Sequence, residues 1–213
     1  MKKMLPKEIE EKSFSIIEKR IPLGMFSQAE REIVKKVVHT TADFTLINKV
    51  FFSPDVIAKA VKILGEGRDI FTDVAMVGAG ISPQYLKGYR GKVICEIRNP
   101  EVAKIAEKEG VTRSEAAVRY AVANNSNIGI FAIGNAPTAL FEVIKLTKEG
   151  QIKEDVLVIG ACVGMVGAAE AKSKLIKSGL PVIAIRGKRG GSPIAATVIN
   201  GLFKIMKEGK YEK

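Results

Sequence analysis

The chain has 213 residues, of which 46% are hydrophobic and 27% charged, a balance that indicates one globular domain and excludes a disordered chain. It contains 34 Lys and Arg against 23 Asp and Glu, a net charge of +11, which favours an acidic partner such as nucleic acid, a polycarboxylate or a phosphorylated ligand. A generally lysine-rich surface, on which lysine alternates with glutamate, is the alternative explanation of this charge.

The sequence carries no signal for targeting, membrane insertion or metal binding. The first eight residues turn charged where a signal peptide needs an apolar core, and the longest uncharged run, 120–141, is interrupted by Asn, Gly and Pro. Cys95 and Cys162 lie far apart without a nearby histidine, so neither a zinc site nor a disulfide is predicted. We therefore expect a cytoplasmic protein with no membrane partner.

Before residue 69 the pattern predicts mainly helices. One is expected around 7–20 and a second over 28–38, where the apolar residues form a single stripe. An extended segment at 45–52 precedes a helix over 54–64, for which Ser53 is a suitable N-cap and Pro54 a suitable first residue.

From residue 69 onward, short apolar runs alternate with helical segments. The predicted strands are 70–74, 92–97, 128–133, 156–160 and 181–185, and the predicted helices are 100–109, 114–123, 137–148, 166–177 and 192–206. This alternation is typical of a doubly wound, mostly parallel five-stranded α/β sheet covered on both faces. We expect a single domain over 1–213, with about 1–66 packed on the sheet.

Four loops that follow predicted strands are rich in glycine, at 74–81, 133–140, 159–170 and 186–192. Ligands of doubly wound sheets bind where such loops leave the carboxyl ends of the strands. Ordinary tight turns explain one or two of these loops. Four of them at one edge favour a broad site for a large, flat or extended ligand.

The glycine spacings fit no nucleotide motif. Gly160, Gly164 and Gly167 lack the dinucleotide-binding spacing, and the loop at 187–192 lacks the phosphate-loop spacing. That loop nevertheless offers glycine N–H groups, two cations and a helix start, which together suit a carboxylate or a phosphate. No Gly-x-Ser-x-Gly motif is present, and Cys162 has no evident base, so nucleophilic catalysis is not predicted.

His39 is the only histidine, and no other side chain titrates near neutral pH without a perturbed environment. It follows the helix at 28–38 on the stripe opposite the apolar one, together with Glu32 and Lys36, so it is expected to face water or a cleft. The alternative is a partly exposed histidine that is favoured only by the helix dipole.

These motifs together resemble the precorrin-8X methylmutase family, called cobalt-precorrin-8 methylmutase in the anaerobic route to cobalamin. The similar segments are 12–17, 39–44, 73–77, 110–114, 133–140, 164–170 and 186–192, in order and over nearly the whole chain. Ile-Gly-Asn-Ala-Pro-Thr-Ala-Leu at 133–140, combined with Arg-Gly-x-Arg-Gly-Gly-Ser at 186–192, is a specific pair of motifs.

The resemblance implies a flavodoxin-like fold, a homodimer, and an isomerase that moves a methyl group from C11 to C12 of (cobalt-)precorrin-8. It implies that His39 donates or accepts a proton at the macrocycle. The implied substrate-binding residues are Ser13, Lys36, Thr40, Thr41, Met76, Arg113, Ser114, Asn135, Ala136, Arg186, Gly187, Lys188, Arg189 and Ser192. No cofactor is expected, because any cobalt would belong to the substrate, and the Thr-Thr-Ala-Asp sequence after His39 leans towards the cobalt-bearing route.

The chain departs from the family pattern at several positions. Lys36 stands where the family usually has arginine, so a point charge replaces a bidentate fork. Cys162, Met165 and Ala171 replace the usual Pro, Phe and Ser, which bears on the shape of the pocket.

Two other functions remain open on the sequence. A corrinoid-binding protein without turnover would share the same loops. A basic RNA- or phospholigand-binding domain would share the charge, although no RNA-binding motif and no single basic helix is present, and we expect no nucleic-acid partner.

Overall fold

The computed structural model describes residues 5–209, so the first four residues of the charged N-terminal segment lie outside the described part. Its centre is a six-stranded sheet with the order β1-β6-β5-β4-β2-β3. The strands are β1 (Val50–Phe52), β2 (Asp69–Thr72), β3 (Val93–Ile94), β4 (Ile128–Ile133), β5 (Leu157–Gly160) and β6 (Val182–Ile185). All neighbouring strands are parallel except β1, which pairs antiparallel with β6.

The central strands are almost wholly apolar, and every residue of β4, β5 and β6 is buried. Burial on both faces is what a parallel sheet between two layers of helices requires. Alternate residues point to opposite faces, so Ile130 packs into one core while Phe131 packs into the other.

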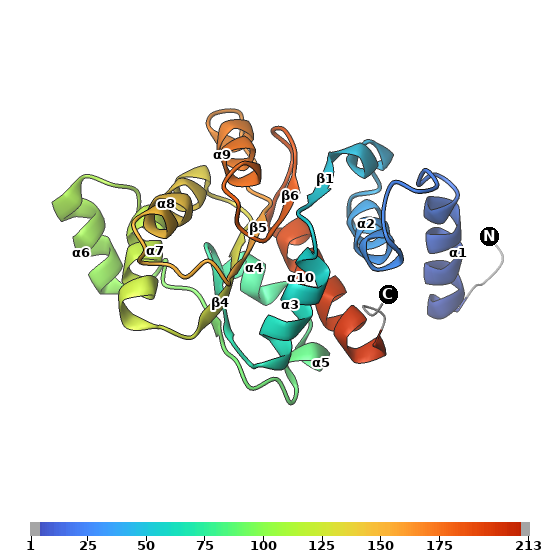
Figure 1. Ribbon diagram of the computed structural model, residues 1–213, viewed down its shortest axis with the longest axis horizontal. Coiled ribbons are helices and arrows are strands. Elements are labelled where there is room, and N and C mark those ends of the chain that lie inside the picture. Colours follow the sequence, from blue (N-terminus) through green and yellow to red (C-terminus); the bar gives the residue numbers. More distant parts are fainter. Residues whose placement is uncertain (1–4, 210–213) are drawn as a thin grey trace.

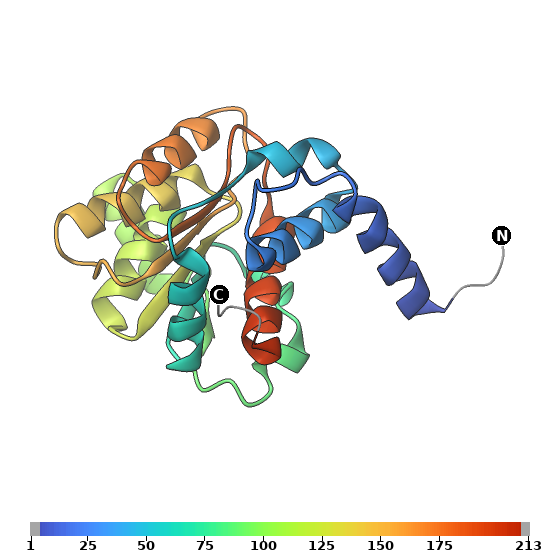
Figure 2. The ribbon, with the colours of Figure 1, turned by 45° about the vertical axis from the view of Figure 1, so that its right-hand side comes forward.

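One face carries the helices from the two ends of the chain. Apolar residues of α2 (Gln28–Thr41), α3 (Val56–Gly65) and α10 (Ser192–Glu208) pack there, beside the short α4 (Ala75–Ala79) and α5 (Pro83–Leu86). The outermost helix, α1 (Pro6–Glu18), packs on α2 and projects from the body, as Figure 2 shows.

The other face is covered by helices from the middle of the chain. These are α6 (Pro100–Glu109), α7 (Arg113–Asn124), α8 (Pro137–Lys148) and α9 (Ala168–Ile176). The two groups of helices lie on opposite sides of the strands in Figure 1.

Without β1, the five parallel strands lie in the order β3-β2-β4-β5-β6. Counted from one along the chain, this is the order 2-1-3-4-5 of flavodoxin-like folds. The order reverses between β2 and β4, and the loops at their carboxyl ends therefore flank the crevice where such folds bind ligands. We call this edge of the sheet the carboxyl rim. From β2 to β6 it spans three strand spacings, roughly 14 Å.

The structure confirms the doubly wound α/β fold but has six strands rather than the five expected. The segment at 45–52, expected to be extended throughout, forms a 3-10 helix, η1 (Phe44–Lys49), before β1. The Asp43 side chain accepts the N–H of Thr45 and so starts this turn. The chain becomes extended only from Val50, where β1 pairs with β6.

The expected N-cap at Ser53 is wrong. Ser53 extends the pairing with β6 instead, because its N–H donates to the carbonyl of Val182 at 2.9 Å and its hydroxyl accepts the N–H of Val182 at 2.8 Å. Helix α3 begins only at Val56, after Asp55 with φ of 57°.

Within residues 5–209, no helix combines the length and the apolar character that crossing a membrane requires.

Candidate active site

His39 lies on the outer side of the last turn of α2, as the apolar stripe predicted. Val37 and Val38 are buried, whereas His39 is exposed. Its Nδ1 is 2.8 Å from the hydroxyl oxygen of Ser13 in α1, and the Phe14 ring meets the imidazole edge-on with the centroids 5.2 Å apart. Because Ser13 engages Nδ1, the other ring nitrogen, Nε2, is left to face a ligand.

A small hollow opens beside the imidazole. Its volume is about 160 Å³, and it is lined by Ser13, Ile16, Ile17, Val38, His39, Ala42 and Phe44. The lining is mostly apolar, which suits contact with an uncharged part of a ligand. Ligand pockets commonly have about 300–1,000 Å³, so this hollow admits only one edge of a large ligand.

The end of α2 is fastened to the loop that follows β6. The Arg189 guanidinium pairs with the Asp43 carboxylate and donates to the Thr45 hydroxyl. Hydrogen bonds from Thr45, together with the charge of Arg189, lower the pKa of Asp43. The ion pair holds His39, one helical turn before Asp43, next to that loop.

Thr40 and Thr41 use their hydroxyl groups differently. Thr40 shares a hydrogen bond of 2.9 Å with Thr197 in α10. Thr41 donates to the carbonyl of Val37 at 2.9 Å and accepts the N–H of Asp43 at 3.3 Å. Thr40 therefore joins α2 to α10, whereas Thr41 closes the end of its own helix.

Residues 186–191, which we call the basic loop, carry exposed cations at the carboxyl rim. Arg186, Lys188 and Arg189 are all exposed. The Arg186 guanidinium lies 4.8 Å from the centroid of the Phe51 ring, and Arg189 is engaged with Asp43. Arg186 and Lys188 are therefore the cations of this loop that are best placed to meet an acidic ligand.

The basic loop is tied to the loop that follows β5. The N–H of Gly164 donates to the carbonyl of Lys188 at 3.1 Å, and the N–H of Gly191 donates to the carbonyl of Ala161 at 2.7 Å. A side chain at Gly190 would collide with the same Ala161 carbonyl, so glycine is required for this close approach.

Lys172 lies beneath these two loops with no exposed surface. Its ammonium group donates to the carbonyl of Arg189 at 2.5 Å. Burial lowers the pKa of Lys172, and burial also raises the pKa of the neighbouring Cys162 thiol to about 11. The thiol is therefore protonated at neutral pH.

Asp73, which follows β2, organises the loop after β4. Its carboxylate accepts the N–H groups of Gly134, Asn135 and Ala136 at 2.9, 2.8 and 2.7 Å. Burial raises the pKa of Asp73, and the three N–H donors act against that shift. Because Asp73 occupies these N–H groups, the polar group that this loop exposes at the rim is the side chain of Asn135, while Ala136 is partly exposed.

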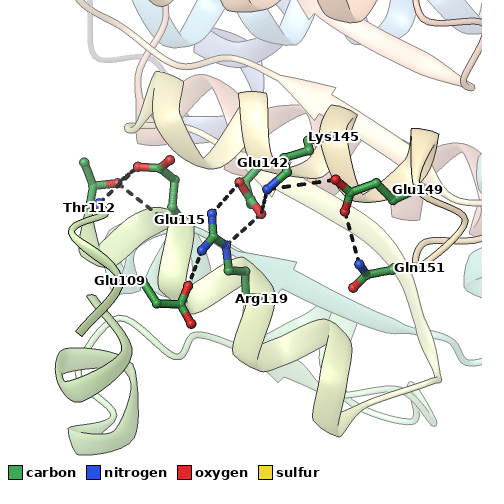
Figure 3. Close-up of polar contacts among 8 residues, drawn as sticks. All are labelled: Glu109, Thr112, Glu115, Arg119, Glu142, Lys145, Glu149 and Gln151. Carbon is green, nitrogen blue, oxygen red and sulfur yellow. Dashed lines mark hydrogen bonds and ion pairs between the residues drawn. The ribbon is translucent and has the colours of Figure 1, made fainter. Parts of the chain in front are cut away.

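Ion pairs of the half-buried Arg119 with the buried Glu142 and the exposed Glu109 hold α6, α7 and α8 together, as Figure 3 shows. Arg119 donates from Nε to Glu142 at 2.8 Å and from a terminal nitrogen at 3.2 Å, and it also pairs with Glu109. Thr112 caps α7 through Glu115 and contacts the Thr138 hydroxyl at 2.8 Å. This contact brings the start of α7, with Arg113 and Ser114, next to the start of α8 at the rim.

Several large apolar side chains are exposed at the carboxyl rim. Met76 in α4 is 68% exposed, and in the loop after β5 Val163, Met165 and Val166 are 43%, 81% and 89% exposed. Exposed apolar surface that is rimmed by polar residues commonly marks an interaction or ligand-binding site.

The first two turns of α10 lie between the two groups of site residues. Gly134 packs against Ser192 and Ala195, and Thr197 in the next turn reaches Thr40. Ser192 itself is 7% exposed, so its part in the site is to pack under the rim. Lys36 is half-buried one turn before His39, 5.9 Å from the Phe14 ring centroid, and burial lowers its pKa.

A larger hollow, of about 430 Å³, lies at the opposite edge of the sheet. It is lined by charges of both signs, including Lys59, Lys62, Glu66 and Asp155, and contains none of the predicted site residues. In residues 5–209, no group of three or more His, Cys, Asp or Glu side chains is arranged to hold a metal ion.

Two residues of the rim were missed by the sequence reasoning. Asp73 directly follows a buried strand, and a lone carboxylate in that position was a usable signal. Lys172 lies on the apolar stripe of α9, with Ala168, Ala171 and Leu175, where an unpaired lysine is unusual.

The fold and the rim define a class: a flavodoxin-like α/β protein that presents a histidine and a row of cations around an apolar surface. The comparisons with known proteins specify it further. A family model described as precorrin-8X methylmutase matches residues 8–205. The chain belongs to this family, and it is an isomerase of cobalamin biosynthesis that shifts a methyl group within its substrate.

The similar proteins cover nearly the whole chain. A cobalt-precorrin-8 methylmutase of Methanocaldococcus jannaschii is 40% identical, over 88% of this chain and 85% of that protein. One of Priestia megaterium is 37% identical, over 96% and 90%. A crystal structure of a precorrin-8x methyl mutase from Thermus thermophilus superposes with a TM-score of 0.86 at 31% identity, covering 95% of this chain and 97% of that one.

Proposed function

We propose that the chain moves a methyl group from C11 to C12 of cobalt-precorrin-8 and that His39 is the group that exchanges a proton with the macrocycle. The observation that carries this proposal is the contact between Ser13 and Nδ1 of His39 at 2.8 Å, which orients the imidazole and leaves Nε2 free for the substrate. A methyl shift breaks one carbon–carbon bond and forms another in the same molecule, so it needs no redox partner.

The charge of the rim supports an acidic substrate. A corrin precursor is fringed by acetate and propionate carboxylates. The exposed Arg113, Arg186 and Lys188, with the half-buried Lys36, offer cations at different points of the rim. Because these cations come from three different parts of the chain, α2, α7 and the basic loop, they suit several carboxylates around one large ring better than a single anion.

The exposed apolar side chains support a flat, hydrophobic ring. Met76 and Met165 have flexible side chains that fit an irregular surface. The hollow beside His39 accepts one edge of such a ring, and the rest lies across the rim. Holding the ring in one reactive geometry supplies part of the rate enhancement, since positioning alone contributes up to about 7–11 kcal/mol in favourable cases.

We further propose that the protein acts as a homodimer. Leu5, the N-cap of α1, and Ile9 within that helix are 68% and 51% exposed, and neither lines the hollow beside His39. An outer helix with so much exposed apolar surface gains stability when a second copy covers it. Sedimentation of the purified chain tests this directly, and a monomer at micromolar concentration would overturn it.

The test of the function is turnover of purified protein with cobalt-precorrin-8 in excess, followed by the visible spectrum of the corrinoid. We expect each protein molecule to convert many molecules of cobalt-precorrin-8. A spectral change that stops at one corrinoid per site would instead support a binding protein without turnover. Metal-free precorrin-8, supplied in parallel, decides whether the cobalt is required.

A further inference from the structure

Lys172 is a buried charge without a counter-charge. It has no exposed surface and is surrounded on α9 by Ala168, Ala171 and Leu175. Within residues 5–209, no carboxylate oxygen lies within 4 Å of its ammonium nitrogen, which donates instead to the carbonyl of Arg189 at 2.5 Å. Lysine is almost never fully buried unless it is paired, so this arrangement requires an explanation.

The explanation is not the stability of the fold. Removing an ammonium group from water costs several kcal/mol, and one carbonyl satisfies only one of its three N–H donors. A well-packed apolar side chain of similar length at this position would cost no such penalty, just as replacements of whole buried ion pairs by apolar residues of similar volume are often neutral or stabilising. The lysine must therefore serve the loops that cover it.

Lys172 reaches the point where the two glycine loops meet. Side chains in a helix lean towards its N-terminus, so this side chain extends from the second turn of α9 back to the carboxyl rim. The ammonium group lies near Cys162, which begins one loop, and binds the carbonyl of Arg189 in the other. It thereby adds a third tie to the two backbone hydrogen bonds between the loops, Gly164 to Lys188 and Gly191 to Ala161.

We propose that Lys172 is a positioning residue that locks the basic loop by binding the carbonyl of Arg189. The lock holds the backbone of residues 186–191 in one conformation, with Arg186 and Lys188 turned towards the substrate. Its contribution to substrate binding rests on the proposed function, whereas the lock itself does not.

Limited trypsin digestion of the folded protein tests the lock without any substrate. Trypsin cleaves after Lys and Arg, and the basic loop offers Arg186, Lys188 and Arg189 on its surface. For Lys172→Met we expect cleavage within 186–190 to be about tenfold faster or more, at a melting temperature within about 2 °C of the wild type. Lys177→Met, the same change at an exposed position near the end of α9, should cleave like the wild type.

A merely structural role has a different signature. If Lys172→Met only weakened the whole fold, cleavage in the exposed α6, at Lys104 and Lys108, would rise in the same proportion as cleavage in the basic loop. That result, or cleavage of the loop at the wild-type rate, would overturn the proposal. If the methionine variant does not fold, Lys172→Gln replaces it, because glutamine keeps a hydrogen-bond donor of shorter reach. Cleavage of its basic loop is expected to be faster than in the wild type while cleavage in α6 stays unchanged.

Steady-state kinetics then test the role in binding. With cobalt-precorrin-8, Lys172→Met is expected to raise KM by about tenfold while kcat stays within about threefold, because only the binding geometry is disturbed. An unchanged KM in an active enzyme overturns this role. Inactivity of the wild type would instead refute the proposed function and leave the digestion result to decide on the lock.

Discussion

The two ends of the carboxyl rim are built in opposite ways. At the β2–β4 end, buried carboxylates are fully paired: Asp73 accepts three N–H groups, and Glu142 is held by Arg119. At the β1–β6 end, His39 is exposed, and its neighbour Ser13 comes from a helix that projects from the body. The comparison indicates that one end supplies a fixed shape, whereas His39, the group that we propose exchanges a proton, stays accessible.

The largest expected effect comes from breaking the fixed end at Asp73. In Asp73→Ala three N–H groups lose their acceptor, at about 1–3 kcal/mol each. The substitution also removes the cost of burying the Asp73 carboxylate, so we expect the free energy of unfolding to fall by the lower part of that sum, about 3–5 kcal/mol. Activity at 25 °C should fall as well, because the loop at 134–136 loses its order. Urea unfolding measures the loss of stability, and a turnover assay measures the loss of activity. Asp155→Ala, at an exposed carboxylate, is the control, and equal effects of the two would contradict this account.

A somewhat smaller loss of stability, without loss of function, is expected at Glu142. Glu142→Ala leaves the Arg119 charge partly buried and unpaired, which should cost about 3 kcal/mol and lower the melting temperature by roughly 6–12 °C. Because the pair supports α7 and α8 from behind the rim, kcat of the folded enzyme should stay within about twofold of the wild type. Glu149→Ala, at the exposed C-cap of the same helix, should change neither quantity.

At the accessible end, the effects should appear in catalysis rather than in stability. Ser13→Ala removes one hydrogen bond to His39, worth about 0.5–1.5 kcal/mol, so kcat should fall by about three- to tenfold. The melting temperature should not change, since Ser13 lies on the outer helix. Ser15→Ala, on the same helix, serves as the control. An unaltered kcat would show that the contact does not orient the imidazole.

The smallest effect is expected at Lys36, and it depends on pH. Burial lowers the pKa of Lys36 from its usual value of 10.5, so its charge is lost at a lower pH than that of an ordinary lysine. Binding of an acidic substrate should therefore weaken as pH rises through that lowered pKa. Lys36→Arg stays charged and should keep its KM there, a difference of a few-fold at most for a partly exposed pair. If KM depends on pH in the same way in the two proteins, Lys36 does not contribute to substrate binding.

Local sequence signals predicted much of the fold. The bounds of β4, α6 and α8 were predicted to the residue, because continuous apolar runs and Pro at the first helical position mark them. Strand β1 and the start of α3 were not, since Ser53 is drawn into pairing with Val182, which is 129 residues away in the sequence. Such pairing overrides a local capping signal and leaves no trace near residue 53.

The site was predicted unevenly for the same reason. The apolar stripe of α2 was enough to predict that His39 faces outward, whereas Ser13 came only from the family resemblance. Asp73 acts on N–H groups some 61 residues away, and Lys172 acts on a carbonyl 17 residues away. Neither interaction has a sequence motif, because each depends on how two loops meet at the rim.

The most direct test of the account is single-turnover conversion of cobalt-precorrin-8 by His39→Ala, with binding of the substrate measured alongside. We expect the rate of the chemical step to fall by about 10²–10⁴-fold, as for the loss of a positioned acid or base, while the dissociation constant changes only a few-fold. Conversion at the wild-type rate would contradict the assignment of the proton transfer to His39.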